Sequence, residues 1–103
     1  MYEDRKKQFE KKFELDEEKK FKVIARRNKH LALWAAELLS ISDNNKNEYI
    51  KEVLESDFRK PGDEDIVEKI KEDFDRNAVN ISKDEIRDKI EYFLEISAKE
   101  LEN

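Results

Sequence analysis

Apolar side chains recur every three or four residues along several stretches of this chain, which is the spacing that lines one face of an α-helix. The longest of these stretches covers residues 21–39 and contains the only Trp and the densest apolar run, residues 31–36. On a helix, its apolar residues would form one broad buried face, made of Ile24, Leu31, Ala35, Leu38 and Leu39 and widened by Trp34 and Ile41. We therefore predict a central helix here, whose small alanines allow neighbouring helices to pack closely against it.

Three further helices are predicted from the apolar spacing and from the residues that start and stop helices. The second begins with the capping-box pair Asn45 and Glu48 and ends before Pro61. The third starts where three acidic residues follow Gly62, and the fourth starts with the capping-box pair Ser82 and Glu85. The residues predicted to be buried are Tyr49, Ile50, Val53, Leu54 and Phe58 in the second helix, Ile66, Val67, Ile70 and Phe74 in the third, and Ile86, Ile90, Phe93, Leu94 and Leu101 in the fourth. Because the connections are short, the expected fold is an all-α four-helix bundle.

The first 20 residues have a different pattern, because 14 of them are charged and few are large and apolar. Burying about five apolar side chains would contribute roughly 10 kcal/mol, whereas ordering about 20 backbone residues costs about 1–2 kcal/mol each. We therefore expect residues 1–19 to be a mobile N-terminal segment that continues into the first helix, with residues 20–103 as the four-helix domain. Phe9 and Phe13 are four residues apart and either anchor this segment in a partner's groove or pack into the bundle.

Charge divides the chain unevenly. Residues 1–30 contain 11 Lys and Arg against 7 Asp and Glu, whereas the remaining 73 residues contain 11 against 20, within a formal net charge of −5. The acidic body disfavours binding to nucleic acid or to anionic membranes, so the basic third is expected to contact one defined partner. Within that third, Arg26, Arg27 and Lys29 are either a solvated helix face or a contact for a protein or a nucleotide.

The composition argues against several kinds of function. With no Cys, one His and one Gly, the chain has neither a nucleophile paired with a base nor a glycine-rich phosphate loop, so we predict no enzymatic activity. His30 lacks His or Cys partners for a metal, and the polar run 43–47 fails as a calcium loop because Glu48 and Leu54 stand where Gly and Glu are required. We expect no cofactor. Because no apolar run exceeds six residues and no cysteine is present, we predict a soluble, cytoplasmic protein without a membrane span or a signal peptide.

Several motifs resemble one known family, the zeta subunit that inhibits the F-type ATP synthase of alphaproteobacteria. The most specific is KFKVIARRNKHLALWAAELL at residues 20–39, in which ARRNK and LWAAE look like the family signature. PGDEDI at 61–66 and EIRDKI at 85–90 are similar in order and spacing, and DRKKQFEKKF at 4–13 looks like the inhibitory segment of the family.

The resemblance implies a four-helix domain whose N-terminal segment, roughly residues 1–19, folds as a helix inside a catalytic αβ interface of the F1 sector, near the rotor subunit. There it would block ATP hydrolysis, whereas rotation in the synthesis direction would expel it. The implied contact residues are Tyr2, Arg5, Phe9, Lys12 and Phe13, with a secondary contact at Arg26, Arg27 and Lys29. The protein is expected to be a monomer when free and to reach the inner membrane only through the F1 sector.

The chain also departs from the family pattern. Gln8, Glu14 and Lys19 stand where smaller or apolar residues are usual, which predicts a thinner apolar stripe and weaker inhibition. His30 and Ala32 stand where Leu and Gly are common, and Ala32 should stiffen the central helix. The alternative function is that of a non-catalytic helical adaptor that binds a regulatory protein or a nucleotide through its folded bundle.

Overall fold

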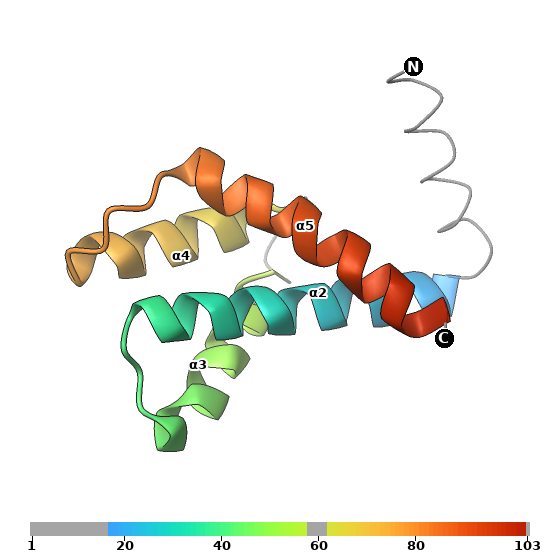
Figure 1. Ribbon diagram of the computed structural model, residues 1–103, viewed down its shortest axis with the longest axis horizontal. Coiled ribbons are helices and arrows are strands. Elements are labelled where there is room, and N and C mark those ends of the chain that lie inside the picture. The colour runs from blue at the N-terminus through green and yellow to red at the C-terminus, as the bar shows by residue number, and fades with distance from the viewer. Residues whose placement is uncertain (1–16, 58–61, 103) are drawn as a thin grey trace.

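The computed structural model describes residues 17–57 and 62–102 (Figure 1). Within this part the chain forms four α-helices and no strand: α2 (Glu17–Leu38), α3 (Asp43–Ser56), α4 (Glu64–Arg76) and α5 (Lys83–Glu102). Helix α2 packs against α3 and α5, and α4 packs against the same two helices. The prediction of an all-α fold built from four helices is therefore confirmed. Tyr2, Arg5, Phe9, Lys12 and Phe13 lie outside the described residues, as do Phe58 and Pro61.

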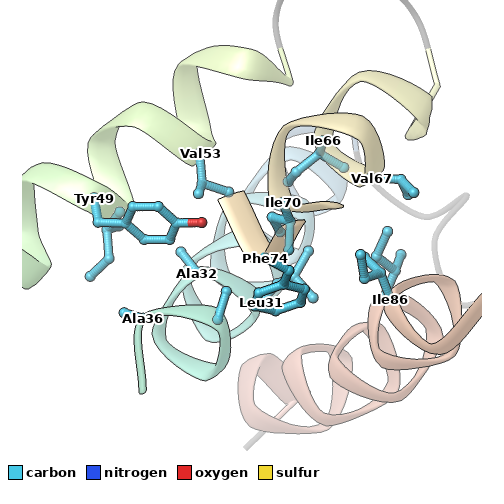
Figure 2. Close-up of a cluster of buried hydrophobic side chains, with 13 residues drawn as sticks. Leu31, Ala32, Ala36, Tyr49, Val53, Ile66, Val67, Ile70, Phe74 and Ile86 are labelled. Atoms are coloured by element: carbon cyan, nitrogen blue, oxygen red, sulfur yellow. The ribbon is translucent and has the colours of Figure 1, made fainter. Parts of the chain in front are cut away.

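The core is formed by side chains from all four helices. Helix α4 contributes its whole predicted stripe, because Ile66, Val67, Ile70 and Phe74 are all completely buried. Figure 2 shows Phe74 beside Leu31 of α2, with Ile86 of α5 in the same cluster of side chains. The Trp34 ring meets the Phe74 ring edge-on, with their centroids 5.6 Å apart. The single Trp is therefore anchored on the most buried aromatic side chain of the core.

Helix α2 is the long central helix that the sequence predicted, although its bounds and its buried face differ in detail. Leu31 and Ala35 are fully buried as expected, but Ile24 and Leu38 are 38% and 40% exposed. The reason is length: α2 has 22 residues and is about 33 Å long, whereas α3 and α4 have 14 and 13 residues. The apolar stripe of α2 therefore continues past the helices that cover its middle.

Two helices end in the same hydrogen-bonding arrangement. After α2, the amide of Ile41 donates to the Ala36 carbonyl over 3.0 Å, and after α4, the amide of Val79 donates to the Phe74 carbonyl over 2.8 Å. The residues just before these two donors, Ser40 and Ala78, both have φ of 57°. These are Schellman motifs with a left-handed residue that is not glycine.

The predicted start of α5 is confirmed in atomic detail. The amide of Glu85 donates to the Ser82 hydroxyl over 3.1 Å, and a Glu85 carboxylate oxygen lies 3.5 Å from the Ser82 amide. This is the reciprocal arrangement of a capping box. Ile81 and Ile86, which flank the box, both belong to the core or pack against it.

The predicted start of α3 is wrong. The helix begins at Asp43 with Ser42 as its N-cap, so Asn45 lies inside the first turn, where its amide donates to the Ser42 carbonyl over 2.9 Å. It ends at Ser56 with Asp57 as its C-cap, before Pro61 as predicted. None of the helices in the described part of the chain combines the length and the apolar character needed to cross a membrane.

Candidate partner-binding surface

The first half of α2 presents a basic groove together with the ends of two other helices. The groove has a volume of about 520 Å³ and lies where the start of α2 meets the end of α5 (Figure 1). Its α2 side is lined by Lys22, Ala25, Arg26, Lys29 and His30, and its other side by Leu54, Glu100 and Leu101. Three Lys and Arg side chains against one carboxylate make this an anion-attracting surface.

Glu100 is the centre of the charge arrangement in this groove. Its Oε1 atom lies 2.9 Å from His30 Nε2 and 3.6 Å from Arg26 Nη1. The hydrogen bond from His30, with a smaller contribution from Arg26, holds the pKa of Glu100 below its usual value. The His30 ring is stacked on Phe93 with centroids 5.7 Å apart, so the imidazole is packed against an aromatic ring of α5. In the described part of the chain, no group of three or more His, Cys, Asp and Glu side chains is arranged to hold a metal ion.

Arg27 corrects the prediction that the basic run is one exposed surface. Its neighbours Arg26 and Lys29 are exposed, but the Arg27 side chain is only 4% exposed. Its Nη2 atom donates to Asn28 Oδ1 over 2.7 Å and to Asp63 Oδ1 over 2.9 Å. In this fold Arg27 therefore ties helices together, and it does not form a surface with Arg26.

The same network reaches the end of α3. Asn28 Nδ2 donates to Asp57 Oδ2 over 2.8 Å, and Arg27 Nη2 lies 3.9 Å from that same oxygen. One buried guanidinium thus joins α2 to the residue that ends α3 and, through Asp63, to the residue that precedes α4. A buried charge is tolerated when it is paired and hydrogen-bonded in this way. Asn28 was not among the predicted site residues, although its place among the apolar positions of α2 was a usable signal.

A second polar network joins α3 to α4. Asp73, which is 6% exposed, accepts a 2.8 Å hydrogen bond from the Tyr49 hydroxyl and pairs with Lys69 Nζ at 2.9 Å. Burial, followed by the nearby Asp73 carboxylate, raises the pKa of Tyr49 far above its usual value. Burial lowers the pKa of Lys69, but its hydrogen bonds to Asp73 and Glu52 outweigh this effect and raise the pKa overall. Tyr49 and Asp73 lie in the interior, Lys69 is partly buried beside them, and the Asp73 carboxylate is also bound by Arg76.

Exposed apolar side chains gather at the start of α2, next to the segment for which the contact residues were predicted. Phe21 is 71% exposed and Ile24 is 38% exposed. Ile24 was predicted to lie in the core, and no role was predicted for Phe21. Lys22 and Glu100 in the basic groove were also missed, because the contact between α2 and α5 that brings them together is not visible in the sequence.

A comparison with protein-family models bears directly on this arrangement. The model for the ATPase inhibitor subunit zeta matches residues 1–100. The chain belongs to this family. The match extends through all four helices of the zeta fold and also includes the residues before α2, so the resemblance stated from the motifs is confirmed. A comparison with curated proteins finds no match. Membership of the zeta family supports a role in ATPase inhibition.

Proposed function

We propose that this zeta subunit inhibits ATP hydrolysis by the F1 sector of an F-type ATP synthase. Residues 1–19 act as the inhibitory segment, which folds as a helix in a catalytic αβ interface near the rotor subunit and blocks rotation. Residues 20–103 form the domain that carries the segment. The observation that carries this proposal is the family match over residues 1–100, because it includes the segment as well as the helices.

The chemistry of the segment suits this mechanism. No Gly or Pro occurs between Met1 and Glu17, so a helix formed by these residues can run directly into α2. On that helix, Phe9 and Phe13 share one face, and an apolar groove in the partner supplies the burial that the segment lacks by itself. Tyr2, Arg5 and Lys12 complete the proposed contact residues. Once the helix is wedged between two subunits, the opening and closing of the catalytic site is blocked sterically, and no chemistry by the inhibitor is needed.

The direct test compares three proteins for inhibition of ATP hydrolysis by a purified F1 sector. These are the full chain, a chain lacking residues 1–19, and the full chain with Phe9→Gln and Phe13→Gln. The shortened chain is a fair control because, in the part of the chain that the structure describes, the buried apolar residues all lie between Val23 and Ile90. We expect inhibition by the full chain and little or none by the other two. Equal hydrolysis rates with all three and with no addition would reject the proposal.

On this proposal, the protein is a monomer when free and reaches the inner membrane only through the cytoplasmic F1 sector. The alternative function is a helical adaptor that binds a regulatory protein or a nucleotide through its bundle, and the basic groove at Arg26 and Lys29 is the feature that favours it. Hydrogen exchange with and without the F1 sector separates the two functions. Inhibition by the segment predicts new protection in residues 1–19, whereas the adaptor predicts that protection is confined to the groove residues.

A further inference from the structure

The apolar stripe of α2 is exposed at the end where the helix begins. Residues 21, 24, 28, 31, 35 and 38 alternate in steps of three and four, so they lie along one line on the helix surface. Along this line the exposed fractions are 71% for Phe21, 38% for Ile24, 3% for Asn28, 0% for Leu31, 0% for Ala35 and 40% for Leu38. Phe21 and Ile24 therefore belong to the same face that the bundle buries in the middle of α2.

The other helices explain why this end is uncovered. Helices α3 and α4 are too short to cover the whole of α2 (Figure 1). Helix α5 does reach the start of α2, where Glu100 contacts Arg26 and His30 and Phe93 stacks on His30, yet Phe21 and Ile24 stay exposed. Single exposed apolar side chains are ordinary on protein surfaces. Two large ones on successive turns, in line with the core stripe, form a small docking face.

The position of this face indicates what covers it. The inhibitory segment leads directly into α2, and in the proposed bound state the two form one helix. Phe13 and Ile24 are eleven residues apart in the sequence, so on that helix they would point in directions that differ by only about 20°. Phe9 is one turn before Phe13 and lies on the same side. A groove that accepts these two rings would meet Ile24 on the same face about three turns after Phe13, and it would meet Phe21, which points about 80° away from Phe13, at the side of that face.

We propose that the ATPase groove that takes the inhibitory segment also covers Phe21 and Ile24, so that the binding surface ends at Ile24 within the folded domain rather than at Lys19. This inference rests on the proposed function and extends it. The occupant is an apolar groove of the ATPase. As a consequence, the helix is continuous through residues 17–19 in the complex, and the bundle is held at a fixed angle to the groove.

Four variants of the full chain test this inference: Phe21→Gln, Ile24→Gln, the two combined, and Leu38→Gln as the control. Leu38 is a close match for Ile24 because it lies on the same line of α2 with nearly the same exposure, 40% against 38%, at the opposite end. Glutamine is polar and favours helices, so the helix itself is preserved. The measurement is the concentration of each variant that halves ATP hydrolysis by the purified F1 sector.

We expect Phe21→Gln and Ile24→Gln each to weaken inhibition about tenfold, as the loss of one buried apolar side chain would. Leu38→Gln should change it less than about twofold. If the wild type inhibits and the Phe9 and Phe13 variant does not, but the Phe21 and Ile24 variants match the Leu38 control, this inference is wrong and the proposed function stands. If the wild type does not inhibit at all, both are wrong.

Two measurements on the wild-type chain do not depend on the folding of any variant. Hydrogen exchange in the presence of the F1 sector should show new protection through Ile24, and protection that stops before Phe21 would overturn the inference. Sedimentation of the free chain should give the mass of a monomer. If self-association appeared instead and was lost in the Phe21→Gln variant, the face would belong to a second copy of this chain and the inference would also fail.

Discussion

Arg26 and Arg27 are neighbours in the sequence, yet they have different environments and different consequences for the protein. Arg26 lies at the rim of the basic groove, where its side chain is 46% exposed and 3.6 Å from Glu100. Arg27 is 4% exposed and holds Asn28 and Asp63. One step along a helix turns the side chain by about 100°, and here that step leads from solvent to the interior. Arg26 therefore acts as a surface charge, whereas Arg27 links α2 to the residue before α4 from the interior.

The contributions of the two arginines to stability should differ as much as their environments. Exposed ion pairs contribute little, since water and salt screen them. Removing one partner of a buried pair is costly, because the remaining charges stay buried without compensation. The two interior networks, one around Arg27 and one around Asp73, should therefore dominate the stability of the helix junctions. The cluster around Glu100 should affect titration and partner binding much more than folding.

The largest expected effect comes from removing the buried guanidinium. Arg27→Ala removes the positive charge beside the buried Asp57 carboxylate and the donor to Asn28 Oδ1, although Asn28 still donates to Asp57, and it removes the partner of Asp63 at the edge. We expect a loss of about 3 kcal/mol in the free energy of unfolding, toward the low end for a buried pair because Asp63 is 47% exposed. Urea unfolding followed by circular dichroism measures this. The matched control, Arg26→Ala, should change stability by less than about 0.5 kcal/mol. Equal losses for the two variants would contradict the comparison.

The second prediction concerns the other interior network. Tyr49→Phe keeps the ring but removes the hydroxyl that donates to Asp73, and we expect a loss of about 1.5 kcal/mol. The effect should be smaller than that of Arg27→Ala, because Lys69 and Arg76 still bind the carboxylate. Tyr92→Phe is the control, since Tyr92 is 53% exposed, and it should change stability by less than about 0.5 kcal/mol. Urea unfolding at neutral pH gives both values.

The raised pKa of Tyr49 adds a dependence on pH with a definite sign. The folded state favours the neutral phenol, so the contribution of Tyr49 is fully present below the pKa of the unfolded state, about 10, and is lost as the pH rises above it. The stability difference between the wild type and Tyr49→Phe should therefore shrink above about pH 10. A difference that grew with pH would show that Tyr49 is not held in the neutral form.

The elements that the sequence predicted well are those specified by local residues. All four helices were expected, the stripe of α4 is buried throughout, and the Ser82 capping box is present, because spacing and capping depend on residues a few positions apart. The start of α3 was misplaced because Asn45 and Glu48 match the capping pattern better than Ser42 does. The structure places Ser42 at the N-cap without a side-chain hydrogen bond.

The features that the sequence did not reveal depend on residues that are distant in the chain. The partner of Arg27 is Asp63, 36 residues away, and the partner of His30 is Glu100, 70 residues away. A lysine or arginine in a basic run is expected to be exposed until such a partner is known. The contact residues predicted for the ATPase, such as Phe9 and Phe13, lie outside the described part of the chain and remain predictions.

The smallest predicted effect lies in the exposed cluster and concerns titration. His30 is the main cause of the lowered pKa of Glu100, and Arg26 is the lesser one. We therefore expect His30→Leu to raise the pKa of Glu100 toward its ordinary value, and Arg26→Ala to raise it less. Side-chain carboxyl NMR signals followed from pH 7 to pH 2 would measure both shifts.

Because the pKa of Glu100 is lowered on folding, any stability it contributes is present above the unfolded value of 4.5 and lost as the pH falls through the folded one. Glu100 therefore affects stability at acid pH, whereas Tyr49 affects it at alkaline pH. A larger shift from Arg26→Ala than from His30→Leu would mean that the arginine, and not the imidazole, organises this surface.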